Sequence, residues 1–187
     1  MAVLNLIELW RIAIMVFALT YIFSDLASFR QKTLYEYYKG LTFKDLLFVS
    51  AVTGPAVVLH ELAHKFVALL FGLAAELHVS IIGLLIGIVL KMVGSPLIIF
   101  VPGFVSIGGT ASGFAYWLTA FAGPLSNLTL FLTAYIILKK VKIKKETRII
   151  LVLTKNINLW LFIFNMLPIP PFDGFKVFSG IVSALNF

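Results

Sequence analysis

Long apolar stretches alternate with short polar segments along this chain. The apolar runs extend over roughly 4–23, 46–71, 115–138 and 149–167. Each is close to or longer than the ~20 residues with which an α-helix crosses a bilayer. A polar linker, 24–45, separates the first two runs, and a basic segment, 139–148, separates the last two. The pattern predicts a polytopic α-helical membrane protein with about five to six transmembrane segments.

The helical pattern breaks between residues 72 and 113. Residues 81–93 are apolar, but they include two glycines and a lysine. A largely β-branched run at 97–101 is followed by the turn dipeptide Pro102-Gly103 and a second apolar run at 104–107. We interpret 97–107 as a short re-entrant β-hairpin. Non-helical backbone at membrane depth must be covered by protein or line a cavity, so the hairpin also predicts a cavity beside it.

Composition supports a membrane protein. Of the 187 residues, 61% are hydrophobic and 12% are charged, and this excludes a soluble globular domain. The chain has no cysteine, so any metal must be held by His, Asp or Glu side chains. We expect a single transmembrane domain over 1–187, with an accessory helix and linker at 1–45 and the core of the domain at 46–175.

The net charge of +7 arises mostly in the loops between the apolar runs. Basic loops face the cytoplasm in most membrane proteins, so 24–45 and 139–148 are expected on one side. The runs 46–71 and 115–138 provide the required two crossings if 81–107 turns back. We therefore expect a multi-pass protein of the cell membrane with the lipid bilayer as its partner. No pattern typical of nucleic-acid binding is present, so no nucleic-acid partner is expected.

A metal-binding pattern lies inside the second apolar run. His60-Glu61-Leu62-Ala63-His64 is an HExxH sequence, and its spacing places both imidazoles on one face of a helix. Glu61 is turned by ~100° from His60, where it can contact a water on the ion without binding the ion. A zinc ion lowers the pKa of that water toward ~7, and the glutamate carries its proton to the leaving amine. Because ionisable residues in an apolar span are usually functional, we favour a zinc centre over a structural histidine pair.

A catalytic zinc normally has three protein ligands and a water, so a third ligand is required. The candidates are Glu76, His78 and Asp173. The first two follow the helix closely, where a solvated polar residue is the ordinary interpretation. Asp173 lies in a Pro-Pro-Phe-Asp-Gly turn, and capping of that turn is its alternative role. The predicted topology returns Asp173 to the side of the membrane on which both histidines lie, so the three can converge.

Three segments together resemble the site-2 protease family of intramembrane zinc metalloproteases. They are HELAH at 60–64, AGPLSN at 122–127 and NMLPIPPFDG at 165–174. The last is similar to the family pattern Asn-x-x-Pro-x-x-Pro-x-Asp-Gly. Phe172 stands where leucine is usual and Phe175 where a second glycine is common, and neither change removes a functional group. The resemblance covers most of the chain.

The resemblance implies an intramembrane endopeptidase with Zn²⁺ as its cofactor. It implies His60, His64 and Asp173 as zinc ligands and Glu61 as the catalytic base. It also suggests that Asn127 and Asn165 hold the substrate or stabilise the oxyanion, with interhelical hydrogen bonding as their alternative role. The implied partner is a transmembrane helix or membrane-anchored protein, which is unwound and added to an edge strand. The predicted hairpin at 97–107 is the candidate for that strand.

Two alternatives remain at this stage. The chain could be a non-catalytic metal-binding membrane protein or a metal transporter, although transporters often contain internal repeats and this chain has none. The positive-inside pattern places the zinc toward the outside of the cell, whereas the family resemblance implies a site toward the cytosol. Absolute orientation, physiological substrate and oligomeric state are therefore left open.

Overall fold

The computed structural model describes residues 4–95 and 101–185. Within this part, the chain forms helices and one small sheet. In chain order the elements are α1 (Leu6–Ile22), a 3-10 helix η1 (Ser24–Phe29), α2 (Leu34–Tyr38), α3 (Phe43–Leu70), β1 (Ala74–Val79), α4 (Ile81–Met92), β2 (Gly103–Gly108), α5 (Gly113–Lys140), α6 (Lys145–Asn165) and α7 (Asp173–Leu185).

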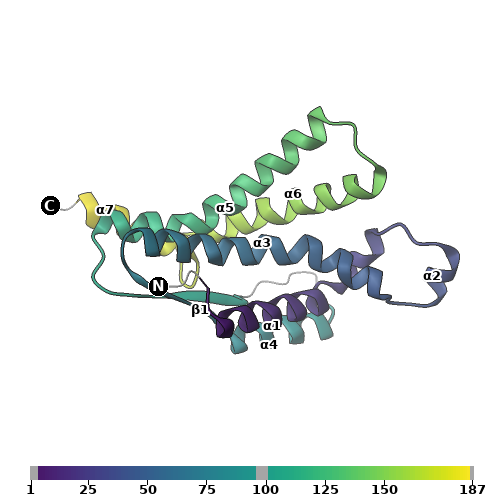
Figure 1. Cartoon of the computed structure of the whole chain (residues 1–187), viewed down its shortest axis with the longest axis horizontal. Helices are drawn as coiled ribbons and strands as arrows, with labels where there is room; N and C mark the ends of the chain where they lie inside the picture. Colours follow the sequence, from purple (N-terminus) through teal and green to yellow (C-terminus); the bar gives the residue numbers. More distant parts are fainter. Residues whose placement is uncertain (1–3, 96–100, 186–187) are drawn as a thin grey trace.

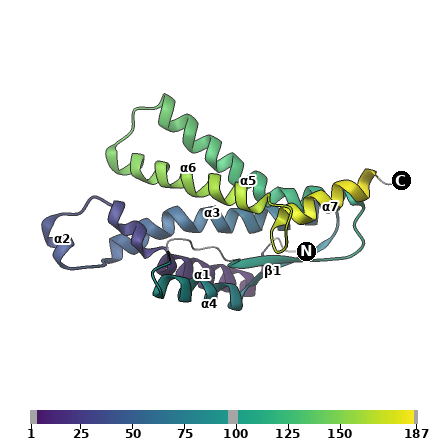
Figure 2. The same ribbon diagram turned by 180° about the vertical axis from the view of Figure 1, so that it is seen from behind.

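The long helix α3 lies in the middle of the fold. Helices α5 and α6 form an antiparallel pair on one side of α3, and α1 and α4 lie on its other side (Figures 1 and 2). Helix α7 packs against α5. Both α1 and α3 begin at capping boxes, formed by Asn5 with Glu8 and by Thr42 with Asp45. These caps fix where the two helices start.

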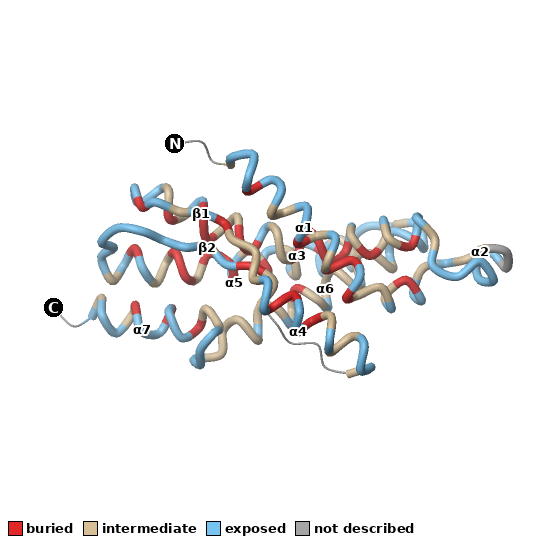
Figure 3. Tube along the Cα trace, turned by 90° about the horizontal axis from the view of Figure 1, so that it is seen from below, coloured by how far each residue is buried: buried red, intermediate tan, exposed pale blue. Residues whose placement is uncertain are grey.

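Among the described residues, three helices are long and apolar enough to cross a membrane, namely α3, α5 and α6. They correspond to the runs predicted at 46–71, 115–138 and 149–167, with ends that differ by at most four residues. Buried residues alternate with exposed ones along the helices, as Figure 3 shows. Large apolar side chains such as Leu132, Ile136 and Ile163 are exposed. Helices α1 and α4 are shorter, with 17 and 12 residues, so a total of five to six spans stays a prediction.

The two basic loops lie at one end of the molecule. The segment around α2 and the connection between α5 and α6 are both found there, while the sheet and α7 lie toward the opposite end (Figure 1). This is the relative arrangement that the positive-inside pattern predicts. The HExxH sequence lies in the second half of α3, away from both loops.

The predicted hairpin over 97–107 is wrong in its pairing. Strand β2 pairs antiparallel with β1, with Leu77 opposite Val105, and α4 lies between the two strands in sequence. The Ser80 N–H donates to Pro102 O (3.0 Å), so Pro102 continues the ladder instead of forming a turn. Residues 97–100 of the predicted hairpin lie outside the described residues. The true partner, β1, was missed because Glu76 and His78 interrupt its apolar pattern.

Side chains of α1 cover the outer edge of β1. Glu8 Oε1 accepts the Leu77 N–H (2.9 Å) and pairs with the ammonium of Lys65 on α3. Arg11 donates to Leu77 O (2.8 Å) and pairs with Glu76. Glu8 and Lys65 are both buried, so each charge has its counterion inside the fold. Helix α1 thus joins the sheet to α3, and among the described residues β2 forms the open edge of the sheet.

Candidate metal centre

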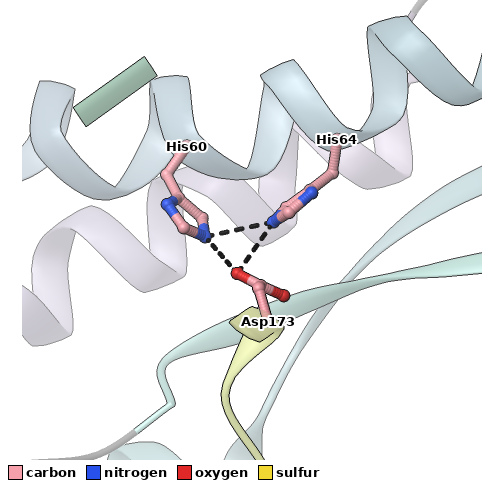
Figure 4. A group of neighbouring side chains, drawn as sticks. All are labelled: His60, His64 and Asp173. Carbon is pink, nitrogen blue, oxygen red and sulfur yellow. Dashed lines mark hydrogen bonds and ion pairs between the residues drawn. The ribbon is translucent and has the colours of Figure 1, made fainter. Parts of the chain in front are cut away.

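Three potential ligands converge between α3 and the start of α7. His60 and His64 lie one turn apart on α3, and Asp173 points between their rings (Figure 4). The Asp173 Oδ2 atom lies 3.0 Å from His60 Nε2 and 3.1 Å from His64 Nε2. The two Nε2 atoms are 3.1 Å apart. The structure thus brings together the three residues that the sequence singled out as ligands.

Hydrogen bonds on the far side of each imidazole fix its tautomer. His60 Nδ1 lies 2.6 Å from Asn127 Oδ1, and His64 Nδ1 lies 2.7 Å from Thr119 O. Carbonyl oxygens only accept, so each Nδ1 carries the hydrogen and donates it. Each Nε2 then presents a lone pair toward the Asp173 carboxylate. Two lone pairs and a carboxylate repel one another unless a cation lies among them, so the arrangement fits a metal ion.

The donor set matches zinc. Two imidazoles and a carboxylate are typical catalytic zinc ligands, with bonds of about 2.0–2.2 Å. A tetrahedral ion with such bonds separates its ligands by about 3.3–3.6 Å. The observed separations of 3.0–3.1 Å require each donor to move outward by only a few tenths of an ångström. Three protein ligands leave a fourth position for water, as in catalytic zinc sites.

Two glycines allow the close approaches that build this centre. A Cβ atom added at Gly123 on α5 would overlap the Nε2 atoms of both His60 and His64. A Cβ at Gly174 would lie 2.5 Å from the carbonyl oxygens of Met166 and Leu167. Glycine therefore keeps the ligand cluster open at one position and lets the loop after α6 fold tightly at the other.

Substituting Gly123 with alanine is expected to weaken zinc binding by roughly 10- to 100-fold, the range found for disturbed metal surroundings. The added methyl group displaces the histidine rings, whereas alanine itself favours the helix. Competition with a chromophoric zinc chelator measures the affinity. Gly54→Ala is the matched control, because its Cβ meets only Val16 at 3.6 Å. Wild-type affinity in Gly123→Ala would contradict the assigned packing.

A cavity of about 470 Å³ lies beside the cluster. Its lining includes His60, Glu61, His64, Asp173 and Asn165. The Glu61 side chain is buried and forms no hydrogen bond with another residue in the described part of the chain. Its carboxylate is therefore available to a water or substrate in the cavity. The Asn165 amide is likewise without a hydrogen bond to the described residues.

Asn127 differs from Asn165 in its surroundings. It is completely buried, and its Nδ2 donates to Ala56 O and to Asn158 Oδ1, both at 2.8 Å. Its Oδ1 accepts from His60. Both amide hydrogens are thus used inside the protein, which is the interhelical bonding considered above. A direct role for Asn127 toward substrate stays a prediction.

The other two candidates for third ligand lie in β1. Glu76 pairs with Arg11, and His78 Nε2 lies 3.0 Å from Ser106 Oγ. Neither belongs to the ligand cluster. Sequence reasoning also missed the Thr119 carbonyl and Asn158. A backbone carbonyl leaves no signal in the sequence, and a single asparagine in a helix has many possible roles.

Comparison with known proteins places this site in context. The chain is 36% identical over 144 residues to a protein of Methanocaldococcus jannaschii named "Putative zinc metalloprotease". The match covers 72% of each chain. No protein-family model and no solved structure matches the chain. The match extends over most of both chains, and the site has the ligands of a zinc centre. The chain therefore belongs to the zinc metalloprotease family of this archaeal protein.

Proposed function

We propose that this protein is a multi-pass protease of the cell membrane that hydrolyses peptide bonds in transmembrane or membrane-anchored proteins, as the site-2 protease family does. One observation carries the proposal: the histidines and Glu61 lie within α3, a helix long and apolar enough to span a bilayer. At 1.5 Å per residue, His64 and His60 lie about 9 and 15 Å from the end of this helix. Catalysis is therefore proposed within the membrane.

The residues around the cluster account for the chemistry of hydrolysis. His60, His64 and Asp173 would hold a zinc ion, which would supply a Lewis acid that lowers the pKa of a water to about 7. Glu61 lies next to His60 in the cavity, where it accepts the proton of the attacking water and passes it to the leaving amine. The Asn165 side-chain amide, which forms no hydrogen bond with the described residues, is available to donate to the carbonyl oxygen of the substrate.

The open edge of β2 offers a place for an unwound substrate. In two antiparallel strands, every second pair of opposite residues forms no hydrogen bonds within the pair. Both residues of such a pair direct their N–H and C=O groups away from the partner strand. Leu77 directs both groups to α1 side chains, so its partner Val105 directs both groups outward. The same holds for Gly103 and Ile107, two positions away. All three line the cavity that contains Glu61, so an extended peptide added here would pass the metal cluster.

Substituting Val105 with proline tests this binding mode. Proline removes the outward N–H of β2 and leaves the ladder with β1 intact. We expect cleavage of a membrane substrate to slow by roughly fivefold, since one hydrogen bond contributes about 1 kcal/mol, with zinc content unchanged. Val105→Ala, which keeps the N–H, is the control. Equal rates for the proline and alanine variants would contradict strand addition at β2.

Reconstitution tests the proposed function itself. The purified chain is placed in lipid vesicles with a transmembrane peptide whose centre contains a Gly-Pro segment, and the products are identified by mass spectrometry. The proposal predicts cleavage within the apolar segment and loss of cleavage on adding a zinc chelator. Zinc flux into the vesicles without cleavage would instead indicate a metal transporter. Cleavage of soluble unfolded polypeptides alone would contradict the intramembrane assignment.

A further inference from the structure

A chain of buried amides extends from the metal cluster across three helices. His60 on α3 bonds to Asn127 on α5, and Asn127 bonds to Asn158 on α6. Asn158 Nδ2 in turn donates to Thr154 O (2.8 Å), one turn earlier on the same helix. Both asparagines are 0% exposed. Asn158 lies outside the segments that resemble known motifs and outside the cavity.

The direction of each amide in this chain is determined by acceptors. The Thr154 carbonyl oxygen can only accept a hydrogen bond, so it binds the NH₂ group of Asn158 and directs Oδ1 of Asn158 toward Asn127. Asn127 then finds two acceptors on the same side, Asn158 Oδ1 and Ala56 O. Both require its NH₂ group, so its own Oδ1 must face His60.

The opposite orientation of Asn127 would disable His60 as a ligand. If the Asn127 amide were flipped, its Oδ1 would face the oxygens of Ala56 and Asn158, and its NH₂ group would donate to His60 Nδ1. The hydrogen of the imidazole would then move to Nε2, the atom that faces the other ligands. Asn158 supplies one of the two acceptors that prevent this flip. His64 does not depend on this series of hydrogen-bonded amides, because its Nδ1 donates to the backbone carbonyl of Thr119.

We propose that Asn158 is a positioning residue for the metal centre, which acts on His60 by fixing the orientation of the Asn127 amide. This inference rests on the proposed zinc site, which it deepens. Asn158 contacts neither the ligands nor the cavity, so its effect reaches the metal only through Asn127. Substituting it therefore alters zinc affinity in a way that depends on the presence of Asn127.

A double-mutant cycle on zinc affinity tests this dependence. The protein is purified in detergent, and its zinc affinity is measured by chelator competition for wild type, Asn127→Leu, Asn158→Leu and the double variant. We expect Asn158→Leu to weaken zinc binding by about tenfold, at the lower end of the range for residues that orient ligands. In the Asn127→Leu background, adding Asn158→Leu should cause no further loss.

Rescue and control variants separate positioning from packing. Asn158→Asp retains the acceptor oxygen and, when protonated, a donor for Thr154 O, so it should bind zinc within about threefold of wild type. The absorption spectrum of the cobalt-substituted protein should differ from that of wild type in Asn158→Leu and match that of wild type in Asn158→Asp. Thr147→Leu, at an exposed position of the same helix outside the cavity, should leave both measurements unchanged. Asn158→Ala provides the same comparison if the leucine variant does not fold.

Two results would overturn the inference. One is wild-type zinc affinity in both Asn158→Leu and Asn158→Ala. The other is an equal loss of zinc affinity when Asn158→Leu is introduced into the wild-type protein and into the Asn127→Leu variant. An effect on packing alone would be additive in this way. Failure of the wild-type protein to bind zinc at all would instead contradict the metal centre, so the two failures are distinguishable.

Discussion

Replacing Glu61 with glutamine is expected to abolish detectable peptide cleavage while zinc remains bound. Glutamine has nearly the same shape, but its amide cannot accept the proton of an attacking water. Loss of a general base typically lowers a rate by about 10²- to 10⁴-fold. Glu61 is adjacent to His60 and lines the cavity, and it forms no hydrogen bond with the other described residues that the substitution would break. The comparison is made in vesicles with the transmembrane peptide substrate.

Zinc content and a second glutamate provide the controls for this prediction. Metal analysis should show equal zinc in wild type and Glu61→Gln, so the loss of activity is not a loss of metal. Glu76→Gln is the matched variant, since Glu76 lies in β1 and pairs with Arg11 outside the ligand cluster. It should retain most of the activity. Wild-type cleavage by Glu61→Gln would exclude Glu61 as the base.

Replacing Asp173 with alanine is expected to remove zinc from the protein. Asp173 Oδ2 is the one carboxylate oxygen placed within 3.1 Å of both histidine Nε2 atoms among the described residues. Without it the ion has two protein ligands, fewer than the three of a typical catalytic site. After dialysis against a chelator, wild type should keep about one zinc per chain and Asp173→Ala close to none.

The matched control for this ligand is Asp25→Ala. Asp25 is a highly exposed aspartate of η1 that pairs with Lys91 and does not belong to the ligand cluster. Its substitution should leave zinc content unchanged. If Asp173→Ala kept its zinc, Asp173 would be a turn-capping residue and not a ligand. A different third ligand would then be required.

The helices that carry the centre were predictable because two strong periodic signals coincide there. An apolar run of more than 20 residues predicts a helix, and the spacing of His60 and His64 places them on one face of it. The return of Asp173 to the same place followed from the alternating direction of successive spans. These inferences needed only local pattern and chain direction.

The sheet and the support of the ligands depend on contacts far apart in sequence. Strand β1 is short and carries Glu76 and His78, whose partners come from α1 and β2. The role of Gly123 depends on how closely α5 approaches α3, which no local pattern reports. The sequence motif suggested that Asn127 contacts substrate. Only the positions of Ala56 and Asn158 in the fold show that both hydrogens of its amide are donated within the protein. The pairing of the strands and the contacts of Gly123 and Asn127 therefore depend on long-range packing, which local sequence motifs do not report.

X-ray absorption at the zinc edge tests the central claim most directly. For the purified protein we predict one zinc per chain, coordinated by two imidazole nitrogens and by oxygen at about 2.0–2.2 Å, with four ligands in total. His64→Ala should lose one imidazole or the metal, whereas His78→Ala should give the wild-type spectrum. A site with no imidazole, or one that changes with His78 and not with His64, would contradict a zinc centre formed by His60, His64 and Asp173.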